Sequence, residues 1–318
     1  MVLLVAMVEM VEMVEMVKLV LLIEIDDYKC WQVRPAFGTE SEDLRRMYDL
    51  GIIAYSDAFN DAKSRLLTLT RQVRDSDRDG CLVSVLVEGP AGSGKTAVMA
   101  DLAIQAGFGY VKLVSPDLLI RYGEQQKVAK LSQVFDDAYK TKLAMILVDD
   151  VERLLEFANI GSSVRFSNMV LQALMVLLKR RPPSECRLMV VVTTSIHDQM
   201  QLLGLDGMFY SIVGLSMLNT PDQISCVLQA AASTMPAKTV DKISKSIKQI
   251  PVKHLLNALE TACQECHKDV AAISVGAFLS AVCMTPGNSL HEPDPDEPGE
   301  TGSLVSQQDQ QDQQDHDN

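Results

Sequence analysis

Short apolar runs alternate with stretches of helical periodicity through the middle of the chain. The runs are rich in Val, Leu and Ile, which is typical of strands buried on both faces of a sheet. Strands of this kind that are separated by helices favour a three-layer α/β fold, with a parallel sheet between helices. The pattern predicts strands at 82–87, 110–114, 144–148, 188–193 and 212–215, and helices at about 95–106, 124–140, 164–180 and 197–203.

The pattern also divides the chain into two folded parts. Strand-like runs stop after Asn219, whereas helical periodicity continues to residue 284. We therefore expect an α/β domain at 35–218 and a small all-helical lid domain at 219–284. The lid helices are predicted at 223–232, 240–248, 252–267 and 275–282, and two further helices, at 41–55 and 57–74, precede the first strand.

Both ends of the chain have a biased composition. Residues 1–34 contain a Val-Glu-Met repeat whose charges recur too often for a bilayer span of about 20 mostly uncharged residues. We interpret this segment as a low-complexity leader, and the alternative is an amphipathic helix on a membrane or a partner. Residues 285–318 are rich in Pro, acidic residues and Gln. They are expected to be disordered, because they cannot bury enough apolar surface to offset the entropy lost on ordering.

Composition narrows the choice of partners and compartment. The 318 residues carry a formal charge of -13, and residues 291–318 contribute nine acidic side chains without any Lys or Arg. The rest of the chain is mildly acidic, so a nucleic-acid partner is not expected. The seven cysteines are scattered, which favours reduced thiols in the cytoplasm. The segment Cys263–His267 matches the haem-attachment pattern C-x-x-C-H, but it lies in a predicted helix, and we do not expect haem there.

A complete phosphate-binding motif follows the first predicted strand. Residues 89–96 satisfy G-x-x-x-x-G-K-[ST] between that strand and an Ala-rich helix. Glycines let such a loop curl so that backbone N–H groups point at phosphate oxygens, and a turn that merely joins strand to helix is the alternative. Lys95 is expected to reach the β and γ phosphates, and the Thr96 hydroxyl to bind Mg²⁺. The expected nucleotide-binding residues here are Gly89, Pro90, Ala91, Gly92, Ser93, Gly94, Lys95, Thr96 and Ala97.

Two adjacent carboxylates end the predicted strand at 144–148. Asp149 is suited to coordinate Mg²⁺, and Asp150 occupies the place where a water-polarising Glu is expected; helix capping is the alternative role for this pair. Asp is one methylene shorter than Glu, which withdraws the carboxylate by roughly 1 Å, and such a displacement can cost on the order of 10²-fold in rate. Slow hydrolysis is therefore predicted.

Hydroxyl groups end the predicted strand at 188–193, in the sequence Thr193-Thr194-Ser195. A polar group at this point could sense the γ-phosphate or orient the attacking water. Thr and Ser are also common turn residues, so a structural role is the alternative.

The order of these features resembles the AAA+ ATPases, which are P-loop NTPases with a helical lid. More narrowly, residues 35–284 are similar to the second ATPase domain of the vesicle-fusing ATPases, the N-ethylmaleimide-sensitive factor family. The segments that carry the likeness are 35–38, 51–53, 86–90, 135–140, 148–155, 165–168 and 170–174.

The resemblance implies further site residues and the cofactors ATP and Mg²⁺. Ile52 and Ile53 match the stretch that contacts adenine, and Ser195 matches a catalytic sensor position. Lys253 resembles the basic group that approaches the phosphates from the lid. Tyr122 falls where ring ATPases place a pore-facing aromatic, and a loop anchor is the alternative.

The resemblance also implies assembly and partners. Relatives form hexameric rings that disassemble SNARE complexes through an adaptor protein, in the cytoplasm at Golgi and vesicle membranes. Residues 201–216 contain no Arg or Lys, although a ring ATPase would be expected to supply an arginine to its neighbour from this region. Together with Asp150, this absence indicates a site that keeps ATP rather than turning it over. The alternative is that Arg153 or Arg165 reaches the site of an adjoining subunit.

Three interpretations follow from these features. The first is a vesicle-fusing type ATPase, and the second is a nucleotide-dependent oligomerisation module without significant turnover. The third, a small-molecule P-loop kinase, is disfavoured by the lid and the paired acids. In the family, an adaptor-binding domain and a first ATPase domain precede the domain that corresponds to residues 35–284. We therefore interpret the chain as a fragment or a paralogue.

Overall fold

The computed structural model describes residues 52–76, 80–160, 163–266, 270, 273–284 and 289–290. The chain forms two compact units. The first unit ends at Leu218 and also contains Pro251–Lys253, and the second unit contains the remainder from Asn219 onward. The leader predicted at 1–34 and the stretch 291–318 lie outside the described residues.

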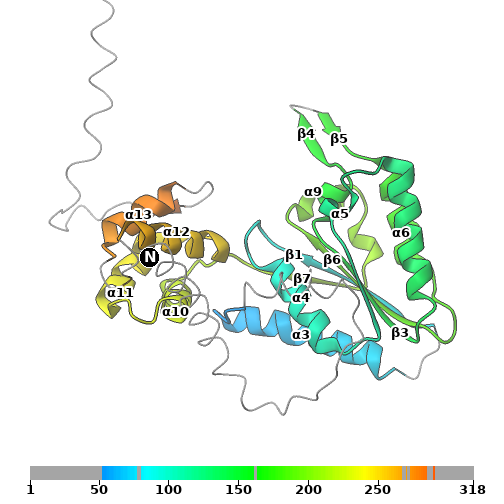
Figure 1. Ribbon diagram of the computed structural model, residues 1–318, viewed down its shortest axis with the longest axis horizontal. Helices are drawn as coiled ribbons and strands as arrows, with labels where there is room; N and C mark the ends of the chain where they lie inside the picture. Colours follow the sequence, from blue (N-terminus) through cyan, green and yellow to red (C-terminus); the bar gives the residue numbers. More distant parts are fainter. Residues whose placement is uncertain are drawn as a thin grey trace, which may run out of the picture. The chain divides into compact units, whose positions relative to one another are not determined.

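The first unit is built on a parallel sheet (Figure 1), and its five strands within the described residues all end at the same edge. The register pairs Val148 with Val192 and Val87 with Thr193. Residues that end or follow these strands are therefore neighbours. Across the sheet the order is β2 (Tyr110–Val114), β3 (Leu143–Val148), β6 (Arg187–Thr194), β1 (Leu82–Glu88) and β7 (Ser211–Gly214).

Helices cover both faces of this sheet, as the alternation of apolar runs and helices predicts. On one face α3 (Asp57–Arg74) packs beside α4 (Lys95–Ala106), and on the other α6 (Glu124–Ala138) packs beside α8 (Asn168–Lys179). Neighbouring residues of β6 face opposite sides of the sheet. Met189 contacts the Thr70 hydroxyl of α3, whereas Val190 belongs to the core beneath α6 and α8.

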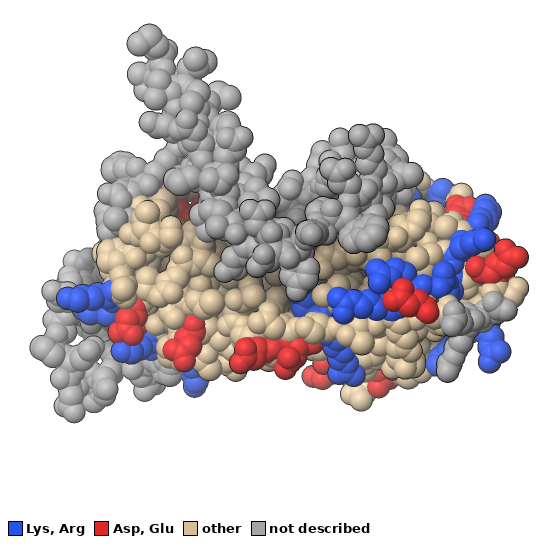
Figure 2. Space-filling view, turned by 90° about the horizontal axis from the view of Figure 1, so that it is seen from below, with Lys and Arg blue, Asp and Glu red and all other residues tan. Residues whose placement is uncertain are grey.

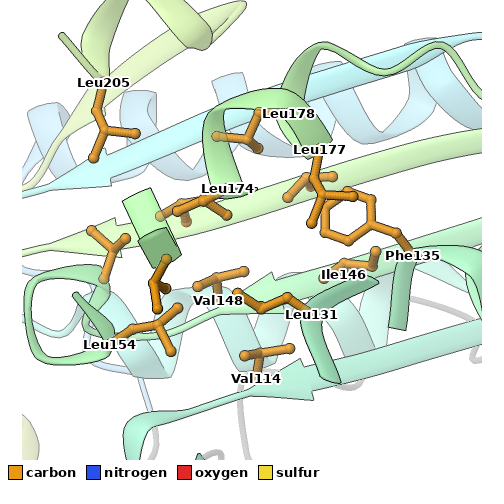
Figure 3. Close-up of a cluster of buried hydrophobic side chains, with 14 of the residues drawn as sticks. Val114, Leu131, Phe135, Ile146, Val148, Leu154, Leu174, Leu177, Leu178 and Leu205 are labelled. Atoms are coloured by element: carbon orange, nitrogen blue, oxygen red, sulfur yellow. The ribbon is translucent and has the colours of Figure 1, made fainter. Parts of the chain in front are cut away.

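Figure 3 shows the core between the sheet and α6 and α8. Phe135 of α6 and Leu174 of α8 are fully buried against Ile146 and Val148 of β3. Burying a side chain of this size contributes about 1.5–3 kcal/mol relative to leaving it in water. This packing holds the end of β3, where the paired carboxylates begin, against the rest of the sheet.

Two helices of the first unit begin after a serine whose side chain caps them. Ser56 precedes α3 and its Oγ accepts a hydrogen bond from Phe59 N, while Ser167 precedes α8 and accepts one from Val170 N. The apolar side of α3 is buried as its spacing predicts, at Phe59, Ala62, Leu66, Leu69 and Val73.

The sequence pattern is wrong at several boundaries in the first unit. Of the helix predicted at 41–55, residues 41–51 lie outside the described residues, and 52–56 are not helical. The helix predicted at 164–180 begins only at Asn168, because β4 (Ala158–Ile160) and the exposed β5 (Ser163–Arg165) form a hairpin before it. The short helices α5 (Pro116–Leu119), α7 (Val151–Leu154) and η1 (Asp206–Met208) were not predicted, whereas α9 (His197–Leu202) was.

The second unit is mainly helical, with one departure from the all-helical prediction. The helix predicted at 240–248 ends at Ser246, and β8 (Ile247–Gln249) pairs with β9 (Ser289–Leu290), which lies in the segment expected to be disordered. Ile250 precedes a proline, a position that disfavours continued helix, and its side chain is fully buried. The helices are α10 (Pro221–Ala231), α11 (Ala237–Ser246), α12 (Val252–Glu265) and α13 (Val275–Cys283).

Two features of the described surface bear on partners. None of the described helices is long and apolar enough to cross a bilayer. On the face seen in Figure 2, the basic and acidic side chains of the described residues lie near one another, among uncharged ones.

Candidate functional site

The loop between β1 and α4 curls tightly beside the chain that follows β7. Gly89, Gly92 and Gly94 all adopt positive φ. A Cβ at Gly89 would lie 2.2 Å from the carbonyl oxygen of Leu215, so only glycine allows the loop to pass this close. The loop leads into the N-terminus of α4, where backbone N–H groups are free of intrahelical partners and can bind an anion. Pro90, Ala91 and Ser93 lie in this turn, and Thr96 and Ala97 continue the helix.

Lys95 is the first residue of α4, and its side chain turns back into the loop. Its Nζ donates hydrogen bonds to the carbonyl oxygens of Gly89 at 2.9 Å and Pro90 at 3.0 Å. Burial lowers the pKa of Lys95, and the charges of Asp150, Glu152 and Asp149 act in the opposite direction. The ammonium group thus lies inside the phosphate-binding loop, and three carboxylates that follow β3 favour its charged form.

Thr96 and Asp149 form the hydrogen-bonded centre of the site. Thr96 Oγ1 donates to the Asp149 carboxylate and lies 3.0 Å from each of its oxygens. Burial raises the pKa of Asp149, an effect opposed by hydrogen bonds from Thr193 and Thr96 and by the Lys95 charge, and reinforced by the Asp150 charge. A hydroxyl and a carboxylate are hard oxygen ligands of the kind that Mg²⁺ prefers, so these two residues fit the metal that accompanies a nucleotide.

Asp150 adopts an unusual backbone conformation at the start of α7. Its φ of 47° and ψ of 62° lie in the left-handed region, which side chains other than those of Asn and Asp rarely enter. Although Asp150 stands at the N-cap of α7, its side chain makes no capping hydrogen bond. One carboxylate oxygen lies 3.5 Å from Arg153 Nε at the surface. The carboxylate is therefore not occupied by the capping role that was the alternative.

Two residues connect these acids to the end of β6: Thr193, one of the three hydroxyl-bearing residues noted in the sequence, and Glu152, which sequence reasoning did not select. Thr193 Oγ1 donates to Asp149 Oδ1 at 2.6 Å and accepts from Asp150 N at 2.8 Å. Glu152 Oε1 accepts a hydrogen bond from Ser195 N at 2.9 Å. Ser195, the predicted sensor, is thus anchored beside the acids through its backbone. The register that pairs Val148 with Val192 places Thr193 beside Asp149, and this was the signal that could have distinguished Thr193 from its neighbours.

A further contact joins the end of β1 to the start of α9. His197 Nδ1 contacts Glu88 Oε2, and Glu88 immediately precedes the phosphate-binding loop. Neither residue was selected from the sequence, because nothing in the local pattern links two positions so far apart. The pair fastens the segment that follows the hydroxyl-bearing end of β6 to the entrance of the loop.

The structure places the remaining predicted residues around the loop. Ile52 and Ile53 are half-buried just before Tyr55, whose hydroxyl donates to Ser216 O at 3.0 Å, one residue beyond the carbonyl that faces Gly89. Lys253, which belongs to the first unit, donates its backbone N–H to Gly92 O at 3.0 Å.

Tyr122 lies apart from these contacts. It follows α5, it is partly exposed, and its ring packs 6.0 Å from Lys130 Nζ. This contact is compatible with either role that the sequence leaves open for Tyr122.

A known family accounts for this arrangement. Residues 85–211 match the family described as ATPase family associated with various cellular activities (AAA). The chain carries an ATPase domain of the AAA family. The match covers the AAA domain from β1 to the start of β7 and includes the loop, both carboxylates and the end of β6.

Several curated relatives of this region are named for vesicle fusion. The chain is 36% identical over 235 residues to the vesicular-fusion protein SEC18 of Saccharomyces cerevisiae, which is 72% of this chain and 31% of that protein. It is 38% identical over 234 residues to a vesicle-fusing ATPase of Arabidopsis thaliana, which is 74% of this chain and 31% of the relative. A vesicular-fusion protein of Schizosaccharomyces pombe is 33% identical over 261 residues. The chain thus spans about a third of the length of these relatives.

Proposed function

We propose that the AAA domain binds Mg·ATP, that the nucleotide supports assembly into a homo-oligomeric ring, a hexamer, and that hydrolysis is slow. The observation that supports this most directly is the convergence of Lys95, Thr96 and Asp149 at the end of the phosphate-binding loop. The ammonium, hydroxyl and carboxylate are the three groups that a P-loop uses toward the phosphates and the metal. Their approach requires the parallel register that aligns the ends of β1, β3 and β6.

Each residue has a separate part in this proposal. Lys95 and the loop N–H groups bind the β and γ phosphates, and Thr96 with Asp149 would hold Mg²⁺. When bound, the metal neutralises negative charge on the phosphates. Ile52 and Ile53 would contact adenine, and Ser195 and Lys253 would approach the γ-phosphate from β6 and from the start of α12.

Two features support slow turnover. The Asp150 side chain is one methylene shorter than that of the Glu expected to polarise water. Its left-handed backbone conformation also limits the positions that its carboxylate can reach. Residues 201–216 carry no Arg or Lys to complete the site of a neighbouring subunit. In related phosphoryl-transfer enzymes such an arginine contributes about 10³- to 10⁵-fold in rate.

The wider role follows from the relatives, which are named for vesicle fusion. We propose that the assembled ring takes part in SNARE complex disassembly through an adaptor protein. The place of action would be the cytoplasm, with peripheral association at Golgi and vesicle membranes. No nucleic-acid partner is proposed, because the sequence lacks the basic excess that backbone binding requires. The alternative is a nucleotide-dependent oligomerisation module without significant ATPase activity, which the Asp150 position also favours.

The decisive experiment compares the purified chain with Lys95→Ala and with Lys142→Ala, a control at an exposed lysine of the same unit. Light scattering after size-exclusion chromatography, with and without Mg·ATP, measures assembly, and phosphate release measures turnover. We expect ATP-dependent oligomers from the parent and the control, but not from Lys95→Ala. ATP at 100 times its Kd should also add about 2.7 kcal/mol to the stability of the folded chain.

The outcomes separate the proposals. Slow but measurable phosphate release supports the ATPase, whereas ATP-dependent oligomers with no release support the assembly module. If Lys95→Ala binds a fluorescent adenine nucleotide as tightly as the parent, the nucleotide site lies elsewhere and both proposals fail.

A further inference from the structure

We infer that Thr193 is a positioning residue of the nucleotide site, one that holds the metal carboxylate and the neighbouring acid in a fixed relation through a single hydroxyl. The inference rests on the proposed binding of Mg·ATP by Thr96 and Asp149.

The Thr193 hydroxyl connects the two acids, because it donates one hydrogen bond and accepts another. Its Oγ1 donates to Asp149 Oδ1 at 2.6 Å and accepts from Asp150 N at 2.8 Å. A hydroxyl group has one donor and two acceptor sites, so it can make both bonds at once. No apolar side chain of the same size could make either bond, and an amide would need more space than this fully buried position offers.

The hydrogen bond from Asp150 N stabilises a turn whose backbone conformation is unfavourable. Asp150 is one of two described non-glycine residues with positive φ, and such conformations persist only where the surrounding structure holds them. Thr193 holds this turn from β6, a strand buried on both faces. The direction in which the Asp150 carboxylate points is therefore coupled to β6.

The bond to Asp149 acts on the metal side of the site. Asp149 Oδ1 accepts from Thr96 and from Thr193, which approach from α4 and β6 respectively. Partners that orient a metal-binding carboxylate typically contribute 10- to 100-fold to metal affinity. Because Thr193 has no exposed surface, it acts on the ligand through Asp149 and Asp150 and not by direct contact.

The structure thus separates two roles within the hydroxyl-bearing end of β6. Thr193 uses its side chain on the acids, whereas Ser195 is held through its backbone by Glu152. Thr194 is equally buried, but its Oγ1 accepts from Ile196 N and does not contact the acids. Thr194 is therefore a matched control for Thr193.

The test uses Thr193→Val, Thr193→Ser and Thr194→Val in the full chain. One readout is the Mg²⁺ concentration that gives half-maximal binding of a fluorescent ATP analogue, and another is binding of that analogue without Mg²⁺. Thr193→Val should require roughly 10-fold more Mg²⁺. Metal-free binding should change less than about twofold, because the loop and Lys95 are untouched. Thr193→Ser and Thr194→Val should behave as the parent.

A second readout needs no nucleotide. Hydrogen exchange at the Asp150 amide, followed in a peptide that covers this turn, should be faster in Thr193→Val than in the parent and in Thr194→Val. Should Thr193→Val fail to fold, Thr193→Cys, whose thiol is only a weak donor, serves in the same comparison.

Unchanged Mg²⁺ dependence and unchanged Asp150 exchange in Thr193→Val would overturn the inference while leaving the proposed function in place. Equal defects in Thr193→Val and Thr194→Val would also overturn it, since they would indicate general loss of packing. A parent chain that binds no adenine nucleotide would contradict the proposed function and this inference together.

Discussion

Thr96 Oγ1 lies 3.0 Å from both carboxylate oxygens of Asp149, although the two residues are 53 positions apart in the chain. The contact exists because the helix that follows β1 starts at the edge where β3 ends, and β6 holds these two strands in parallel register. It keeps a carboxylate inside the protein, where burial opposes the charged form. A buried carboxylate of this kind is more easily explained by ligand binding than by stability.

The first prediction concerns that buried charge. The raised pKa of Asp149 means that the folded chain binds this proton more readily than the unfolded chain. The contribution of Asp149 to stability is therefore present at low pH. It is lost as the pH rises from the ordinary range of Asp through the raised value. In mildly alkaline buffer, Asp149→Asn should raise the unfolding temperature, by roughly 2–4 °C for each kcal/mol gained. It should also weaken Mg²⁺-dependent nucleotide binding by ~10-fold or more.

Thermal unfolding without nucleotide and a Mg²⁺ titration with nucleotide measure the two effects. Asp61→Asn, at an exposed position of α3, is the control and should change neither. A lower unfolding temperature for Asp149→Asn would mean that the hydrogen bonds from Thr96 and Thr193 outweigh the burial of charge.

The second prediction concerns the length of the side chain at Asp150. Asp150→Glu extends the carboxylate by one methylene toward the position expected of a water-polarising group. If distance limits hydrolysis, phosphate release at saturating ATP should rise by roughly 10-fold or more, since displacements of about 1 Å can cost 10²-fold. Asp150→Asn, which cannot accept a proton, should release less phosphate than the parent. Equal turnover for Asp150→Glu and the parent would show that another step is limiting.

Much of the fold could be predicted from the sequence because its strands are buried on both faces. Such strands appear as continuous apolar runs, and the predicted run at 144–148 differs from the observed β3 only at Leu143. The β4–β5 hairpin gave no such signal, because it is short and Val164 on it is exposed. The pairing of β8 with β9 joins segments about 40 residues apart, a relationship that local periodicity does not contain.

The part of the candidate site that could be predicted consists of residues that form a sequence motif or that end neighbouring strands. The loop, Lys95 and Thr96 form one motif, and Asp149 follows from the rule that parallel strands end at one edge. The position of Thr193 beside Asp149 could also have been predicted, because the register that aligns β3 with β6 follows from the same rule. The bond between Glu152 and Ser195 was not predictable, since its donor is a backbone N–H that every residue possesses.

The third prediction tests that backbone contact. Glu152→Ala removes the acceptor for Ser195 N and should let the end of β6 shift, which lowers the rate of phosphate release more than it changes KM. Glu152→Gln keeps a side-chain oxygen that can accept the same hydrogen bond, and it should retain most of the activity. Steady-state kinetics for both variants gives the comparison. Equal losses in Ala and Gln would instead indicate that the carboxylate charge, which acts on Lys95, matters more than the hydrogen bond.

The last prediction concerns the close approach of the loop to Leu215. A methyl group at Gly89 would lie 2.2 Å from the Leu215 carbonyl oxygen, and the φ of 150° at this residue is itself unfavourable for other amino acids. Gly89→Ala must therefore displace the loop, and because Lys95 Nζ bonds to the Gly89 carbonyl, the ammonium should move with it. We expect nucleotide binding to weaken by ~10-fold or more, on the same argument that a 1 Å displacement of a binding group is costly. Gly123→Ala is the control, since Gly123 has ordinary φ and a Cβ there meets nothing within 4 Å. If a fluorescent nucleotide binds Gly89→Ala and Gly123→Ala equally well, the loop can relax away from Leu215, and its close packing is not required for binding phosphate.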